Sequence, residues 1–272
     1  MKTLMTSCGR GGDVVMSMFA ARLVARDIGE NPDLLVRSQY VPVANALAAI
    51  GMPVGKVVGE TAYCPARDEA VSGSFVASWS DRFLGKRYPG YDRYVNCCLS
   101  AVPSEHIASC MAYAGGLTQE LSVVPSMPEA AVKHSVCGKV AAFHFGASDE
   151  RRAIRIPNRP FGPAWRCICL GTKNDPCEAW IDEDKRGVPI SETLDAIAAS
   201  SLVVGSDSMV THLSGIAGIP TLCLHRSLLT IKLADRGVYV RGRSVPVSPK
   251  GILDAAEVRE MTWKELLPMQ ES

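Results

Sequence analysis

Apolar and polar residues alternate along the chain in blocks that predict strands and helices in turn. A short apolar strand over residues 2–7 is followed by a Gly-rich turn, and apolar residues then recur at helical spacing up to about Ile28. Further strands are expected at 34–36 and 54–58, with a helix of small residues at 43–50 between them. Because strand and helix alternate at short spacing, the first part of the chain is expected to form βαβ units with a parallel sheet.

The middle of the chain gives weaker signals. Residues 61–92 are rich in Gly, Pro, Ser and aromatic side chains, and we expect them to be loops with little regular structure. A strand at 94–99 and a helix at 105–114 are expected to follow.

A second series of strands and helices begins after a proline-containing break near residues 125–138. Strands are expected at 139–145, 166–170, 202–204 and 221–224, and helices at 190–199, with Ser191 as N-cap, and at 207–217. The chain is therefore expected to have an α/β fold of two domains, 1–135 and 136–272. Each would be a Rossmann-like lobe with a parallel sheet, and the two lobes would face a cleft.

The composition fits this interpretation and excludes several classes of protein. Of the 272 residues, 47% are apolar and 21% are charged, which excludes a mainly disordered chain. The formal net charge of +1 argues against a protein that coats nucleic acid through overall charge, but leaves a local basic patch open. No apolar run is long enough for a membrane span, and the first residues lack the apolar region of a signal peptide. We expect a soluble, cytoplasmic protein.

The ten cysteines contain no Cys-x-x-Cys pair, so we expect reduced, buried thiols and no metal site. His106, His134 and His225 lack the spacing of metal ligands and are assigned no role. The run Asp182-Glu183-Asp184 matches the Asp-x-Asp pattern of some metal sites, but it continues into basic residues and is interpreted as a charged turn.

The strongest local pattern runs from residue 202 to residue 221, as strand, polar turn, helix and Gly-Ile-Pro stop. Open α/β sheets bind ligands at the carboxyl ends of their strands, and a helix N-terminus favours phosphate. Asp207 and Ser208 in the turn are therefore candidate ligand-binding residues, as is His212 in the helix. Helix capping by Asp207 or Ser208, and a buried structural role for His212, remain alternatives.

This stretch resembles the signature of the ADP-heptose:lipopolysaccharide heptosyltransferase family, glycosyltransferase family nine. The residues that match it in register are Asp207, Ser208, His212, Leu213, Gly218, Pro220 and Thr221. Met209 departs from the pattern, because the family usually has glycine there. The resemblance implies the GT-B architecture.

Two further segments resemble the same family. Gly12-Asp13 follows the first strand as the family's Gly-Asp does, which implies that Asp13 is the catalytic base; a capping role is the alternative. Residues 143–148 precede a group of arginines, which implies that Gly146, Ser148 and one arginine contact the donor diphosphate. Arg152 is our choice among them, although a plain surface loop remains open.

The resemblance implies an inverting, metal-independent glycosyltransferase without a cofactor. It would move a sugar from an ADP-heptose-like nucleotide sugar to a hydroxyl of a saccharide, a glycolipid or DNA. The implied donor-binding residues are Gly12, Gly146, Ser148, Arg152, Ile190, Asp207, Ser208 and His212.

Two other functions stay open at this point. One is a viral-type transferase acting on a nucleic-acid base, with Trp79, Tyr88 and Tyr91 lining the groove beside the arginines. The other is a non-catalytic binding module that keeps the fold, which the departure at Met209 suggests.

Overall fold

The computed structural model divides into two compact units, Met1–Pro128 and Glu129–Ser272. It describes residues 1–62, 79, 81–97, 139–147, 152–226, 242–248 and 250–266. The expected domain boundary after residue 135, the expected helix at 105–114 and the candidate residue Ser148 lie outside the described residues. Among the described helices, none is long and apolar enough to cross a membrane.

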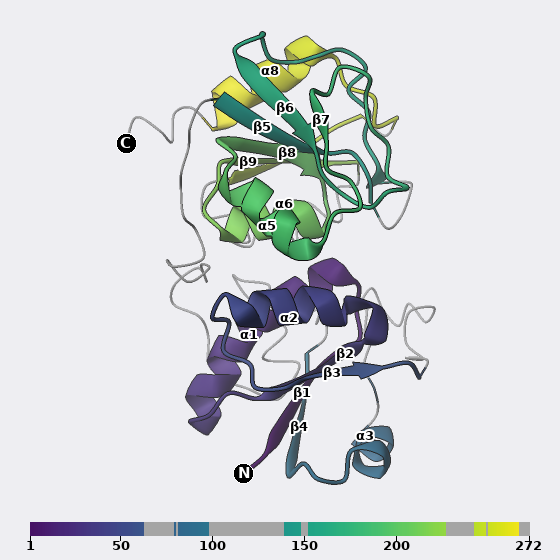
Figure 1. The fold of residues 1–272 in the computed structure, drawn as a ribbon, viewed down its shortest axis with the longest axis vertical. Helices are drawn as coiled ribbons and strands as arrows, with labels where there is room; N and C mark the ends of the chain where they lie inside the picture. The colour runs from purple at the N-terminus through teal and green to yellow at the C-terminus, as the bar shows by residue number, and fades with distance from the viewer. Residues whose placement is uncertain are drawn as a thin grey trace. The chain divides into compact units, whose positions relative to one another are not determined.

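The first unit is a four-stranded parallel sheet with helices on both faces (Figure 1). Its elements are β1 (Thr3–Ser7), α1 (Gly11–Ile28), β2 (Asp33–Arg37), the 3-10 helix η1 (Ser38–Tyr40), α2 (Val41–Ala49), β3 (Val57–Glu60), α3 (Asp81–Arg87) and β4 (Arg93–Asn96). The strand order is β3-β2-β1-β4. Helices α1 and α2 cover one face, and Leu84 of α3 packs with Leu4 and Leu35 on the other.

The end of α1 shows how the local sequence determines where a helix stops. The helix ends where Gly29 adopts a left-handed conformation with φ 74° and donates its N–H to the carbonyl of Ala25. Glycine takes this conformation without a side-chain clash, which is why it so often follows the last helical turn. The predicted end of the helix near Ile28 is confirmed.

Two predictions for this unit are wrong. The strand expected at 54–58 begins only at Val57, because Asp33 Oδ1 accepts the N–H of Lys56 at 2.7 Å and holds the preceding residues in a turn. The segment 61–92, expected to lack regular structure, contains α3. Seven residues are too few to show a clear helical period, so the sequence pattern did not reveal it.

The second unit is a six-stranded parallel sheet. Its elements are β5 (Lys139–His144), β6 (Trp165–Cys169), β7 (Glu183–Asp184), α5 (Ile190–Ala198), β8 (Leu202–Ser206), α6 (Met209–Ile216), β9 (Thr221–His225), β10 (Gly242–Pro246) and α8 (Ala255–Glu265). Helices α5 and α6 lie on one face and α8 on the other (Figure 1). Pro189 is the N-cap of α5, so the expected cap at Ser191 is wrong.

The strand order of this sheet fixes where a ligand would bind. The order is β10-β9-β8-β5-β6-β7. Strands β6 and β7 follow β5 on one side of it, and β8, β9 and β10 then follow on its other side. This is the order of the doubly wound nucleotide-binding fold, whose ligands bind where the order reverses, at the carboxyl ends of the two central strands. In this unit those strands are β5 and β8.

Candidate functional site

The candidate site lies at the carboxyl ends of β5 and β8. Gly146 follows β5, and the turn of Asp207 and Ser208 follows β8. The Ser206 hydroxyl donates a hydrogen bond to the carbonyl of Gly146, which ties the two strand ends together. The site therefore occupies the point at which the strand order reverses.

Asp207 is the centre of the charged contacts. Its Oδ2 accepts a hydrogen bond from Nη1 of Arg152 at 2.8 Å, and its Oδ1 lies 3.3 Å from Nε2 of His212. Burial by itself would raise the pKa of this carboxyl, since only 13% of the side chain is exposed. The hydrogen bond from His212, and the charges of His212, His225 and Arg152, outweigh burial and hold the pKa of Asp207 well below its usual range.

Ser208, and not Asp207, is the N-cap of α6. Its N–H donates to Oγ1 of Thr211 at 3.1 Å, while Asp207 turns its carboxylate to Arg152 and His212. Near Ser208, the first N–H groups of α6 lack partners within the helix, as at every helix start. With the positive end of the helix dipole, they favour an anion at this position.

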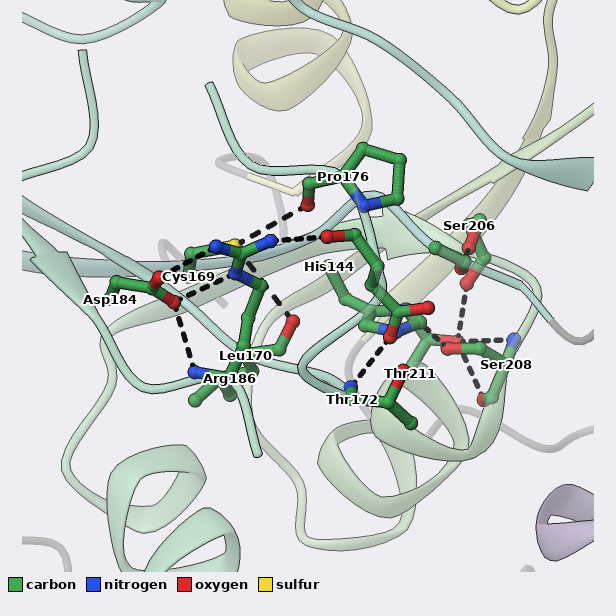
Figure 2. Close-up of polar contacts among 12 residues, drawn as sticks. His144, Cys169, Leu170, Thr172, Pro176, Asp184, Arg186, Ser206, Ser208 and Thr211 are labelled. Carbon is green, nitrogen blue, oxygen red and sulfur yellow. Dashed lines mark hydrogen bonds and ion pairs between the residues drawn. The ribbon is translucent and has the colours of Figure 1, made fainter. Parts of the chain in front are cut away.

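His144, the last residue of β5, joins the start of α6 to the loop after β6 (Figure 2). Its Nδ1 is 2.8 Å from Oγ of Ser208, and its Nε2 is 3.3 Å from Oδ2 of Asp175. Burial raises the pKa of Asp175, but the hydrogen bonds from His144 and from the Thr172 N–H lower it further, to below its usual value. The His144 ring therefore bridges the hydroxyl of Ser208 and the carboxylate of Asp175.

Two glycines make room for this contact. A Cβ at Gly146 would lie 2.2 Å from Oδ1 of Asp175, and a Cβ at Gly171 would lie 2.5 Å from its Oδ2. Gly171 also has a φ of 132°, which side chains rarely adopt. Gly146 thus leaves room for Asp175, while its contact with the donor diphosphate stays a prediction.

The structure distinguishes among the arginines that follow β5. Arg155 bonds Glu178 through Nε at 2.5 Å and Nη2 at 3.0 Å, and Arg159 bonds both carboxylate oxygens of Asp182 at 2.8 Å. Arg152 instead reaches Asp207 at the end of β8. Arg151 lies outside the described residues, as does Ser148.

Asp13 lies in the first unit, in the first turn of α1. Its Oδ2 accepts the N–H of Arg10 at 2.6 Å, so the carboxylate does stabilise the helix start. A Cβ at Gly9 would lie 2.2 Å from Oδ2 of Asp13, so only glycine leaves room for this contact. Gly12 precedes Asp13 in α1, and Ile190 is the first residue of α5. Within the second unit, the structure therefore gathers Arg152, Asp207, Ser208 and His212 around one point.

Two further polar residues beside Asp207 were given no role by the sequence analysis. Cys223 and His225 of β9 lie with Sγ and Nε2 3.1 Å apart, and their ligand atoms and one from Asp207 lie within 4.8 Å of one another. The sequence did carry a signal for this pair. Cys223 and His225 are two residues apart on a predicted strand, and residues at that spacing share a face of the sheet.

The aromatic residues expected to line a nucleic-acid groove have other roles. Trp79 is 1% exposed and packs in the core of the first unit with Leu84. The hydroxyl of Tyr88 donates to Glu60 at 2.6 Å, and that of Tyr91 donates to Asp33 at 2.7 Å. Because Trp79 is buried, the expectation that it lines a nucleic-acid groove is wrong.

The acidic run after β6 was expected to be a charged turn, but Glu183 and Asp184 form strand β7, which pairs with β6. The charges of the run are paired with basic residues. Asp182 bonds Arg159, Glu183 pairs with Arg166 and Lys185, and Asp184 bonds Arg186. These arginine hydrogen bonds lower the pKa values of Asp182 and Asp184 to about 2.

No protein-family model matches the sequence, and no curated protein matches it either. Solved structures do match. E. coli ADP-heptose LPS heptosyltransferase II superimposes with a TM-score of 0.68 at 14% identity, covering 100% of both chains. E. coli heptosyltransferase WaaC with ADP gives 0.67 at 11% identity, covering 97% of this chain and 100% of that one. The chain has the heptosyltransferase fold. A glycosyl transferase family 9 protein from Veillonella parvula gives 0.62 at 9% identity, covering 97% of this chain and 89% of that one.

The heptosyltransferase fold confirms the predicted fold class, an α/β chain with two Rossmann-like parallel sheets. Within this fold, three residues of the signature lie at the reversal point of the second sheet. Asp207, Ser208 and His212 converge there although they come from a turn and a helix, and Arg152 joins them from the segment after β5.

Proposed function

We propose that the protein is an inverting glycosyltransferase that moves a sugar from a nucleoside diphosphate sugar to an acceptor hydroxyl. The observation that carries the proposal is the cluster of Arg152, Asp207 and His212 at the start of α6, placed at the reversal point of a heptosyltransferase fold. Because ADP and ADP-heptose are bound by proteins of that fold, an ADP-heptose-like donor is the first to test.

The leaving nucleoside diphosphate gathers negative charge as the bond to the anomeric carbon breaks. The guanidinium of Arg152 offers a planar set of donors to phosphate oxygens, and the N–H groups at the start of α6 add the positive end of the helix dipole. These groups supply the charge stabilisation for which other transferases use a divalent cation. We therefore propose that the transfer step itself requires no metal.

Asp207 and Asp13 have separate roles in this proposal. The carboxylate of Asp207, ionised at neutral pH, accepts hydrogen bonds from hydroxyls of the donor sugar. Asp13 removes the proton from the acceptor hydroxyl as that oxygen attacks the anomeric carbon opposite the leaving group, which inverts the configuration. Ser208 and His212 hold the donor end of the site, and Gly146 leaves room for Asp175 beside it.

The test is binding and turnover with defined donors. Isothermal titration of the full chain with ADP, ADP-heptose and UDP-glucose should show saturable binding of at least one diphosphate ligand. Release of the nucleoside diphosphate from the bound donor, even slowly to water, should follow. Failure to bind any of the three contradicts the proposal. Tight donor binding without any turnover would instead support the non-catalytic module, in which Met209 replaces the usual glycine.

A further inference from the structure

Three unlike side chains that commonly bind transition metals meet beneath the candidate donor site. Cys223 is fully buried and His225 is 1% exposed, and Sγ of Cys223 lies 3.1 Å from Nε2 of His225. One ligand atom from each of Asp207, Cys223 and His225 lies within 4.8 Å of the other two. The thiol, imidazole and carboxylate groups therefore converge in a small volume.

The fold brings these residues together from neighbouring strands. In the parallel pair β8 and β9, Ser206 is level with Leu224, so the next residue, Asp207, comes level with His225. Cys223 and His225 are two residues apart on β9 and share a face of the sheet. Sγ of Cys223 lies 3.9 Å from Oγ1 of Thr211, so this face is the one that α6 covers.

Helix α6 supplies a candidate fourth ligand, His212, which contacts Asp207 but is not one of the three residues whose ligand atoms all lie within 4.8 Å of one another. His212 reaches Asp207 with its Nε2 3.3 Å from Oδ1. The complete set is one sulfur, two imidazole rings and one carboxylate. Cysteine, histidine and carboxylate are the residues that bind zinc in proteins, usually four at a time in a tetrahedron.

We propose that Asp207, Cys223 and His225, with His212 as the fourth ligand, form a binding site for a zinc-like divalent transition metal. In a tetrahedral site with bonds of about 2.0–2.3 Å, neighbouring ligand atoms lie about 3.3–3.8 Å apart. The three ligand atoms lie within 4.8 Å of one another, so a bound metal requires them to move together by at most about 1.5 Å. A thiolate and a carboxylate carry two negative charges, which balance a divalent cation.

A second cysteine group in the same unit is less suited to a metal. Cys169, Cys177 and Asp184 also have ligand atoms within 4.8 Å of one another. However, both carboxylate oxygens of Asp184 are bonded by Arg186, at 2.8 Å and 2.7 Å, and its side chain is 48% exposed. Burial and the neighbouring Cys177 raise the pKa of Cys169 far above its usual value, which disfavours the thiolate that a metal needs. This group serves as the internal control.

The proposed metal site shares Asp207 with the proposed donor site. A metal bound to this carboxylate would compete with the hydroxyls of the donor sugar, so zinc would inhibit donor binding. This consequence rests on the proposed function, whereas metal binding itself does not. The two ideas can therefore fail separately.

The test uses the full chain, reduced and freed of metal with a chelator, and titrated with Co²⁺ as a coloured substitute for Zn²⁺. We expect one equivalent to produce the intense visible bands of tetrahedral cobalt and a sulfur-to-cobalt charge-transfer band, both abolished by added Zn²⁺. Cys223→Ser should lose the charge-transfer band, and His225→Gln should weaken Co²⁺ binding at least about tenfold. Cys177→Ser should bind as the parent protein does.

Circular dichroism of each metal-free variant shows whether it folds. If Cys223→Ser does not fold, His225→Gln and X-ray absorption of the parent protein with zinc, which should show one sulfur ligand, take its place. The proposal is overturned if the parent protein gives no tetrahedral cobalt spectrum, or if Cys177→Ser abolishes that spectrum while Cys223→Ser keeps it. Titration of ADP-heptose with and without Zn²⁺ then tests competition alone.

Discussion

Asp207 illustrates how one carboxylate can serve both the fold and a ligand. Arg152 and His212 bind its two oxygens from different elements, and the charges around it keep it ionised although it is largely buried. A carboxylate held in this way is a fixed acceptor for sugar hydroxyls. Its partner Arg152 is a cation whose planar donors also match phosphate.

Replacing Arg152 tests the assignment of the phosphate contact. We expect Arg152→Ala to weaken ADP binding by about 10- to 100-fold, because hydrogen bonds to charged groups contribute about 1.5–3 kcal/mol each. Arg155→Ala is the matched control, because that guanidinium is bonded to Glu178. Isothermal titration with ADP measures both. Equal losses in the two variants would show that the arginines act only through the general charge of the segment.

The lowered pKa of Asp207 predicts a change in acid stability. A carboxyl whose pKa is lower in the folded state stabilises the fold above its unfolded pKa of about 3.9, and this contribution is lost as the pH falls toward the folded value. The melting temperature of the parent protein should therefore fall more steeply below about pH 4 than that of Asp207→Asn. Asp184→Asn, at an exposed ion pair, is the control and should change the slope less. Parallel curves for parent and Asp207→Asn would contradict the expectation.

At the scale of elements, His144 links the end of β5, the start of α6 and the loop after β6. We expect His144→Phe to lower the free energy of unfolding by about 1–3 kcal/mol, because it leaves Asp175 without its imidazole partner. Binding of ADP should also weaken, because Ser208 loses the hydrogen-bond partner that orients its hydroxyl. Urea unfolding and isothermal titration measure the two effects.

Arg166→Gln provides the comparison for His144→Phe. The ion pair of Arg166 with Glu183 is exposed, so its loss should cost about 1 kcal/mol or less. If His144→Phe and the parent protein have the same midpoint of urea unfolding, the hydrogen bonds of His144 contribute little to stability.

The elements that the sequence predicted are those with apolar cores and clear ends. Strands β5, β8 and β9 are buried apolar runs, and α1 ends at a glycine as expected. The two-residue strand β7 has only acidic residues, and its pairing with β6 is a matter of tertiary structure. For the candidate site, too, local patterns were predictable and contacts between distant segments were not. The signature revealed Asp207 and His212, but the contact of His144 with Asp175, 31 residues away, depends on how the loop after β6 packs against the end of β5.

At the scale of the whole molecule, the chain shares its fold with proteins of very different sequence. The solved structures match over 97–100% of the chain at only 9–14% identity. Cores tolerate extensive exchange of apolar residues as long as volume and pattern are kept, so overall identity falls before the fold changes.

The last prediction concerns the assignment of the catalytic base to the first unit and of donor binding to the second. Asp13 lies in the first, whereas Arg152, Asp207 and His212 lie in the second. If Asp13 is the base, Asp13→Asn should lower kcat by about 10²–10⁴, because the amide cannot take the proton. The amide oxygen can still accept the N–H of Arg10, so the melting temperature should change little, and ADP binding should be unchanged. Asp27→Asn, at the other end of the same helix, is the control and should keep full turnover. Near-normal turnover of Asp13→Asn would remove Asp13 from the mechanism and leave it as a residue that stabilises the start of α1.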